Sequence, residues 1–229
     1  MPALIRVGHK GANAIVPGNT LESFDAALVA GVDMIELDVL SEHTDGTGEL
    51  YVVHDHGELR RHPVPTLAQA LTHLTSPAFD GVRIQLDLKR SGYEHAALGA
   101  IDAASALARC FISTGEWQSI TRLRALEPHV SLGWTVGSPL AGVPVVGAIA
   151  GSLYRTGLAR AAAARLRDGA VDAIVAQWPL VSRRLVSAVR DAGGELYVWT
   201  VDDAQRIRRL EALGVTGVIT NDPRLFALS

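Results

Sequence analysis

Short apolar segments alternate with helical patterns along almost the whole chain, and this alternation is what most constrains the fold. Predicted strands cover residues 4–8, 34–40, 50–54, 82–88, 110–113, 130–135, 173–175, 195–200 and 217–220. Strands that alternate with helices predict a parallel sheet buried on both faces. Repetition over 229 residues favours an α/β fold of the (β/α)8 TIM-barrel type. A doubly wound sheet is the alternative, but no G-x-G-x-x-G loop follows the first strand.

One gap between predicted strands is too short for a crossover helix. Only residues 41–49 separate the second strand from the third, and they contain the hairpin signal Asp45-Gly46. We therefore expect a short hairpin extension after the second strand, which returns antiparallel beyond the rim of the barrel. Pairing centred near residue 46 places His54 opposite Asp38, to within about two residues.

Capping patterns predict where helices begin. Asn19 as N-cap, with Glu22 three residues on, predicts a helix over residues 20–30 that ends at Gly31. Thr66 and Gln69 form a second capping-box pattern. Further helices are predicted at residues 96–107, 116–127, 159–167, 181–192 and 204–213. Because no linker or low-complexity segment interrupts the pattern, residues 1–229 are predicted to form one domain.

Composition limits the partners and the compartment. A net charge of −3 without a basic run disfavours nucleic acid. The single cysteine, Cys110, fits a reducing compartment, and the first residues turn polar too quickly for a secretory signal, so we expect a cytoplasmic protein. Residues 130–154 carry no charge, but their glycines and prolines favour a strand and a long apolar loop over stable membrane insertion. Lipid contact and the oligomeric state stay open.

Carboxylates interrupt two of the apolar strands. Glu36 and Asp38 lie two residues apart and therefore on one face of a strand, while Asp87 lies near the end of another. The ends of different strands converge at a barrel mouth, where three carboxylates repel one another unless a cation lies among them. Oxygen ligands favour Mg²⁺ or Ca²⁺. The alternative is an ion-pair network with Lys10 and Lys89.

Two histidines lie at the ends of predicted strands near these carboxylates. His9 follows the first strand and His54 ends the third. A lone histidine in such a place is more often structural, but a pair predicts acid–base chemistry, in which one imidazole accepts a proton and the other donates one. Lys10 and Lys89 supply positive charge for an anionic group such as a phosphate. The pattern predicts an active site at the barrel mouth.

A set of motifs extends over almost the whole chain. They are His9-Lys10-Gly11, Pro17-Gly18-Asn19-Thr20, Ser23-Phe24, Ile35-Glu36-Leu37-Asp38-Val39, Val53-His54-Asp55, Pro65-Thr66-Leu67, Asp87-x-Lys89, Val198-Trp199-Thr200-Val201 and Ile219-Thr220-Asn221-Asp222-Pro223. In kind and order they resemble the glycerophosphodiester phosphodiesterase family. The resemblance implies a barrel like that of phosphoinositide-specific phospholipase C. It also implies hydrolysis of glycerophosphodiesters, small phosphodiester substrates, to glycerol 3-phosphate and an alcohol.

The resemblance assigns roles to individual residues. The family's catalytic histidines match His9 and His54. Its metal ligands match Glu36, Asp38 and Asp87, and the implied cofactor is one divalent cation, Mg²⁺ or Ca²⁺, with Mn²⁺ also compatible. The nucleophile is left open between water and the glycerol hydroxyl beside the phosphate.

Four more residues match positions that contact the substrate or orient the site. Lys89 matches a contact to the substrate phosphate, Asn19 matches the asparagine of the P-E-N-T motif, and Trp199 matches an aromatic that lines the pocket. Lys10 stands where the family usually has arginine, which keeps the charge but removes the bidentate fork for phosphate. The resemblance therefore extends to the substrate side of the site.

Three further departures bear on the substrate. Asp87 and Gly18 both stand where the family usually has glutamate. Only residues 56–64 lie where members often carry a sizeable insertion, so the cap over the glycerol end is nearly absent. Two alternatives therefore remain: a lysophospholipase D-like phosphodiesterase that acts on lipids, and a non-catalytic barrel that binds phosphodiesters.

Overall fold

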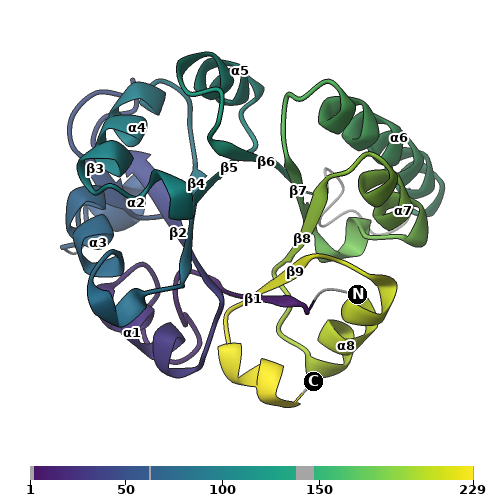
Figure 1. The fold of residues 1–229 in the computed structure, drawn as a ribbon, viewed down its shortest axis with the longest axis horizontal. Coiled ribbons are helices and arrows are strands. Elements are labelled where there is room, and N and C mark those ends of the chain that lie inside the picture. Colours follow the sequence, from purple (N-terminus) through teal and green to yellow (C-terminus); the bar gives the residue numbers. More distant parts are fainter. Residues whose placement is uncertain (1–2, 62, 138–146, 229) are drawn as a thin grey trace.

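Parallel pairing of the first strand with both the second and the last closes the sheet into a barrel (Figure 1). The computed structural model describes residues 3–61, 63–137 and 147–228. The parallel strands within these ranges are β1 Ile5–Gly8, β2 Met34–Ser41, β4 Arg83–Leu88, β5 Cys110–Thr114, β6 Ser131–Val136, β7 Ala173–Gln177, β8 Glu195–Trp199 and β9 Gly217–Thr220. They follow one another around the barrel in chain order. The predicted (β/α)8 barrel is confirmed.

Helices surround the barrel and connect its strands (Figure 1). The α-helices are α1 Leu21–Val29, α2 His56–Leu59, α3 Leu67–Leu74, α4 Glu94–Ala103, α5 Trp117–Leu126, α6 Gly147–Arg167, α7 Arg183–Asp191 and α8 Ala204–Leu213. Short 3-10 helices cover Pro77–Phe79, Leu107–Arg109, Trp178–Leu180 and Pro223–Leu228. The capping box of Thr66 and Gln69 begins α3 as predicted.

The predicted hairpin after the second strand is present. Strand β3, Leu50–Val52, returns antiparallel to β2 and pairs Val39 with Val52. The backbone amide of Val53 then donates to the carbonyl of Asp38 at 3.1 Å. The register is therefore one residue from the predicted one, because Val53 rather than His54 lies opposite Asp38. His54 follows the end of β3, at the mouth of the barrel.

The N-cap predicted for the first helix was wrong. Thr20, not Asn19, caps α1, and its hydroxyl accepts a hydrogen bond from the amide of Ser23 at 3.1 Å. Asn19 adopts a left-handed backbone conformation, with φ of 60°. Its amide instead makes two hydrogen bonds to Asp38, so a tertiary contact replaces the expected local one. The predicted N-cap was thus one residue too early, and the residue concerned, Asn19, contacts the acidic residue Asp38 instead.

The long loop predicted after the sixth strand is only partly correct. Residues 138–146 of that segment lie outside the described residues, but α6 already begins at Gly147, well before predicted residue 159. The buried side chains of Leu158, Ala162 and Leu166 anchor α6 in the core between the sheet and its neighbours. Each residue added to an existing helix gains a hydrogen bond, which offsets the glycine cost of about 1 kcal/mol per residue. No helix within the described ranges is both long and apolar enough to span a membrane.

Apolar side chains fill the barrel interior near the amino ends of the strands. Met34, Phe111 and Tyr197 are fully buried there, and the rings of Phe111 and Tyr197 lie 5.3 Å apart. Gly133 makes room for this contact, because a Cβ atom at that position would lie 2.4 Å from the ring of Phe111. Along β2, Met34 and Glu36 point to the same side of the strand. Polar groups therefore begin one layer above this apolar floor.

Candidate active site

A pocket opens at the carboxyl ends of the strands, at the mouth of the barrel. It is lined by His9, Lys10, Glu36, His54, Gln85, Asp87, Lys89, Thr135, Val175, Trp199, Thr200 and Ile219. Seven of the nine residues predicted for the site are among them. The other two, Asn19 and Asp38, are buried and bonded to each other behind the pocket wall. Residues as far apart in the chain as His9 and Ile219 are thus gathered at one end of the barrel.

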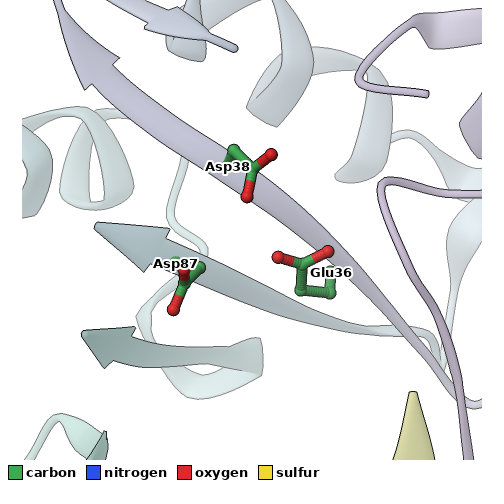
Figure 2. A group of neighbouring side chains, drawn as sticks. All are labelled: Glu36, Asp38 and Asp87. Carbon is green, nitrogen blue, oxygen red and sulfur yellow. The ribbon is translucent and has the colours of Figure 1, made fainter. Parts of the chain in front are cut away.

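The three predicted acidic residues lie together. Glu36 and Asp38 project from β2, and Asp87 projects from β4, where it is the register partner of Asp38 (Figure 2). One oxygen from each carboxylate lies within 4.8 Å of the others. At most 9% of each residue is exposed. Such a group of closely spaced carboxylate oxygens could hold a hard divalent cation.

Two lysine ammonium groups neutralise part of this negative charge. Lys10 Nζ lies 3.0 Å from Asp38 Oδ2, and Lys89 Nζ lies 2.5 Å from Asp38 Oδ1 and 2.6 Å from Asp87 Oδ2. The ion-pair network and the acidic cluster, weighed as alternatives from the sequence, are therefore parts of one arrangement. With all five groups charged, one negative charge remains, and a divalent cation would make the cluster singly positive. That charge matches a phosphodiester monoanion.

The environment separates the pKa values of the two carboxyl groups on β2. Burial raises the pKa of Glu36 well above its usual range, and the nearby charge of Asp38 raises it further. Burial also opposes ionisation of Asp38, but the ammonium groups of Lys89 and Lys10 outweigh it and hold the pKa of Asp38 below its usual range. Burial alone would lower the pKa of Lys89, but the carboxylates of Asp87 and Asp38 raise it. Asp38 is thus the permanent anion of the cluster.

The raised pKa of Glu36 predicts how stability depends on pH without a divalent cation. Between the unfolded value of 4.5 and the raised folded value, the folded protein binds more protons than the unfolded chain. The contribution of Glu36 to the free energy of unfolding is therefore largest below pH 4.5 and is lost as the pH rises through the folded value. We expect Glu36→Gln to remove this loss, as measured by urea unfolding in EDTA from about pH 5 to about pH 7.

The wild type must be compared with Glu36→Gln, because His9 changes the free energy of unfolding with pH in the opposite direction. Its pKa is lowered, so its contribution to stability is lost as the pH falls below its unfolded value of 6.5. The difference between the two proteins at each pH cancels this contribution and isolates Glu36. Parallel stability curves for the wild type and the variant would show that Glu36 is ionised throughout this range.

The two predicted histidines lie in the same pocket at different depths. The side chain of His9 is 20% exposed, and its Nε2 atom lies 3.9 Å from Glu36 Oε2. Burial lowers its pKa, although a hydrogen bond to Asn221 partly opposes this effect, so the imidazole is neutral near neutral pH. The side chain of His54 is 51% exposed at the rim, with Nδ1 3.7 Å from Asp55 Oδ2. One imidazole is therefore partly buried beside the acidic group and the other faces solvent.

Asn19 and Trp199 hold parts of the pocket wall in place. The amide of Asn19 donates to Asp38 Oδ2 at 2.9 Å and accepts from the backbone amide of Asp38 at 3.2 Å. These two bonds fix the side chain of Asp38 against its own strand. The indole of Trp199 donates to the carbonyl of Val175 at 3.1 Å, which orients its ring at the pocket.

Polar residues on neighbouring strands were not predicted for the site. Asp87 Oδ1 accepts hydrogen bonds from Ser113 Oγ at 2.7 Å and Thr135 Oγ1 at 3.0 Å, and Gln85 Nε2 donates to Ser113 Oγ at 3.0 Å. Gln85 Oε1 is buried and has no hydrogen-bond partner among the described residues. Their sequence signal is a polar residue inside an apolar strand, as at Gln85, two positions before Asp87. The side chains at the pocket therefore include oxygen atoms beyond those of the three carboxylates.

The model of the glycerophosphoryl diester phosphodiesterase family matches residues 9–63 and 53–225 of the chain, and these matches include every residue predicted for the site. The chain belongs to this family. Membership confirms the resemblance and the enzyme class expected from the sequence, a phosphoric diester hydrolase. Family membership identifies the class of reaction, and the roles of the individual pocket residues are proposed below.

Relatives of the glycerophosphoryl diester phosphodiesterase family match almost the whole chain. A glycerophosphodiester phosphodiesterase of Arabidopsis thaliana is 27% identical over 95% of this chain and 70% of its own length. One from Caldanaerobacter subterraneus is 24% identical over 95% of this chain and 93% of its own length.

Solved structures agree with the barrel. A glycerophosphodiester phosphodiesterase of Agrobacterium tumefaciens matches with a TM-score of 0.74 and 21% identity, over 99% of this chain and 100% of its own. An Oleispira antarctica phosphodiesterase, solved in complex with the product sn-glycerol-3-phosphate, matches with a TM-score of 0.70 and 20% identity, over 97% of this chain and 94% of its own. At these identities the likeness shows the shared fold.

Proposed function

We propose that this chain hydrolyses glycerophosphodiesters to glycerol 3-phosphate and an alcohol, with one divalent cation, Mg²⁺ or Ca²⁺, held by Glu36, Asp38 and Asp87. The observation that carries the proposal is the carboxylate cluster of Glu36, Asp38 and Asp87 in a family member, since two of these three residues, Glu36 and Asp87, line one pocket together with His9 and His54. We also propose that residues 1–229 form one domain, because β1 and β9 pair and join the two ends of the chain.

The residues of the pocket suit such a cation. Three carboxylates offer oxygen atoms within 4.8 Å of one another, and Gln85 Oε1, which has no hydrogen-bond partner in the described part of the chain, offers a further acceptor for a bound water. Mg²⁺ and Ca²⁺ both prefer oxygen ligands and both accept water in their coordination spheres, which leaves room for Mn²⁺ as well. When bound, the cation acts as a Lewis acid that polarises a non-bridging phosphate oxygen.

The lysines bind the phosphate and stabilise its developing charge. Lys10 and Lys89 lie on either side of Asp38, so their ammonium groups flank the acidic group at the pocket. Positive groups held in place before the reaction stabilise the transition state without reorganisation at the moment of reaction. Lysine acts here as a point charge, because it lacks the planar fork with which arginine binds two phosphate oxygens.

The histidines move protons. One imidazole accepts a proton from the nucleophile, which is water or the glycerol hydroxyl beside the phosphate, while the other donates a proton to the leaving alkoxide. Asn19 fixes Asp38 through two hydrogen bonds and so supports the cluster around which the histidines lie. Trp199 forms part of the wall against which the organic part of the substrate packs.

A comparison of two substrates tests the proposal. We expect the protein, supplied with Mg²⁺ or Ca²⁺, to release glycerol 3-phosphate from glycerophosphocholine, measured with glycerol-3-phosphate dehydrogenase. Preferential cleavage of lysophosphatidylcholine to choline would instead show the lysophospholipase D-like activity. Binding of glycerophosphocholine without turnover under either cation would show a barrel that only binds phosphodiesters.

A further inference from the structure

We propose that Asn221 and Asp202 are positioning residues, which hold the imidazole of His9 in one tautomer and make its Nε2 atom the proton acceptor of the site. The tautomer follows from the structure alone, and its catalytic consequence, that His9 is the base, rests on the proposed function. The geometry that carries it does not involve the cation. Asn221 lies just after β9, and Asp202 follows β8.

The side chain of Asp202 fixes the orientation of the Asn221 amide. Asp202 Oδ2 lies 2.6 Å from Asn221 Nδ2, and Asp202 Oδ1 accepts from the hydroxyl of Thr220 at 2.9 Å and the backbone amide of Asn221 at 2.8 Å. An ionised carboxylate can only accept hydrogen bonds. The NH2 group of Asn221 must therefore face Asp202. The usual ambiguity between amide nitrogen and oxygen is removed by the chemistry of the partner.

The oxygen of the same amide then faces His9. Asn221 Oδ1 lies 2.7 Å from His9 Nδ1, and it also accepts from Asn13 Nδ2 at 3.1 Å. The amide of Asn13 is oriented independently, because its own oxygen accepts from the backbone amide of Gly18 at 3.0 Å. An amide oxygen cannot donate, so the hydrogen of a neutral His9 imidazole must be on Nδ1.

With the hydrogen on Nδ1, the lone pair of His9 is on Nε2. That atom lies 3.9 Å from Glu36 Oε2, so the lone pair faces the acidic side of the pocket. When Nε2 takes the proton, the O–H bond of the nucleophile breaks and its electron pair attacks phosphorus. The P–O bond to the alcohol breaks at the same centre, and the alkoxide receives its proton from His54. The Nδ1–H bond to Asn221 persists throughout.

The variant Asp202→Asn tests this orientation by reversing it. The amide oxygen of the new asparagine keeps the bonds from Thr220 and from the backbone amide of Asn221, and its NH2 group points to the Asn221 side chain. Asn221 must then turn its oxygen toward position 202 and its nitrogen toward His9, which favours the Nε2–H tautomer. The turn also costs the bond from Asn13, so we expect a shifted mixture rather than complete conversion.

Nitrogen-15 NMR of the histidine ring reads the tautomer directly. The measurement uses the full chain in EDTA at about pH 8, where an imidazole is neutral, with the His9 signals assigned by their loss in His9→Gln. We expect Nδ1–H in the wild type, a clear Nε2–H population in Asp202→Asn, and a kcat about 10- to 100-fold lower in that variant with little change in KM.

Asp222→Asn is the matched control. It removes the same charge one residue from Asn221, but the Asp222 carboxylate pairs with Arg224 at 2.8 Å and does not bond to Asn221. We expect its His9 signals and its kcat to match the wild type. An Nε2–H tautomer in the wild type, or an unchanged tautomer in Asp202→Asn, overturns the inference whether or not the protein turns over. Absence of turnover in the wild type, with the Nδ1–H tautomer present, would instead reject the proposed function alone.

Discussion

Replacing His9 with alanine is expected to lower kcat by at least about 100-fold, because the nucleophile then loses the positioned base that accepts its proton. His54→Ala is expected to cause a loss of similar size, since the leaving alkoxide must then take its proton from water. KM should change much less than kcat in both variants. Steady-state release of glycerol 3-phosphate from glycerophosphocholine measures these changes.

A second substrate shows whether His54→Ala lowers kcat through loss of the general acid or through a change in the structure of the pocket. Because His54 does the work of an acid in this scheme, its loss should matter less for a diester whose leaving alcohol is more acidic, such as a nitrophenyl ester. His129→Ala is the control, because this histidine is exposed on the loop before β6 and lies outside the pocket. Thermal unfolding of each variant checks the fold. Wild-type rates in both His9→Ala and His54→Ala would remove the acid–base assignment.

Removal of divalent cations with EDTA is expected to lower turnover by at least about 100-fold, because the phosphate then loses its Lewis acid. Addition of Mg²⁺, Ca²⁺ or Mn²⁺ in excess should restore activity, and the order of the three identifies the preferred ion. The charge of the site supports this expectation. When Glu36 is ionised, the three buried carboxylates and two ammonium groups carry one net negative charge, which attracts a cation.

Calorimetry separates binding of the cation from its catalytic role. Asp87→Asn should weaken Mg²⁺ or Ca²⁺ binding at least about tenfold, since it replaces a charged ligand with a neutral one. Asp191→Asn, which removes an exposed carboxylate from the end of α7, should leave the Kd unchanged. Full activity in EDTA, with no heat of binding at millimolar Mg²⁺ or Ca²⁺, would contradict the proposed cation site.

The hairpin shows how far sequence patterns can go. A gap too short for a crossover helix, together with Asp45-Gly46, was enough to predict the antiparallel return of β3. The register differed by one residue, because the turn pairs Val39 with Val52 and so brings Val53 opposite Asp38. Turn geometry sets such a shift, and the hydrophobic pattern of a three-residue strand is too short to fix it.

Asn19 shows where local reasoning fails. Its sequence context is that of an N-cap, and the competing partner, Asp38, lies on the next strand. The structure gives the cap to Thr20 and uses the Asn19 amide to hold Asp38. A buried carboxylate that lacks hydrogen-bond partners costs more free energy than a helix cap gains, so the tertiary contact wins.

The sequence by itself predicted the order of strands and helices, a barrel in preference to a doubly wound sheet, and seven of the residues that line its mouth. These follow from periodicity and from the rule that residues two apart on a strand share a face, as Glu36 and Asp38 do. Only the tertiary structure decided that Lys10 and Lys89 share Asp38, that the pKa values of Glu36 and Asp38 move apart, and that Asn221 orients His9. The physical reason is that these properties depend on distances and directions between side chains from strands far apart in the chain, and barrel closure alone sets those distances.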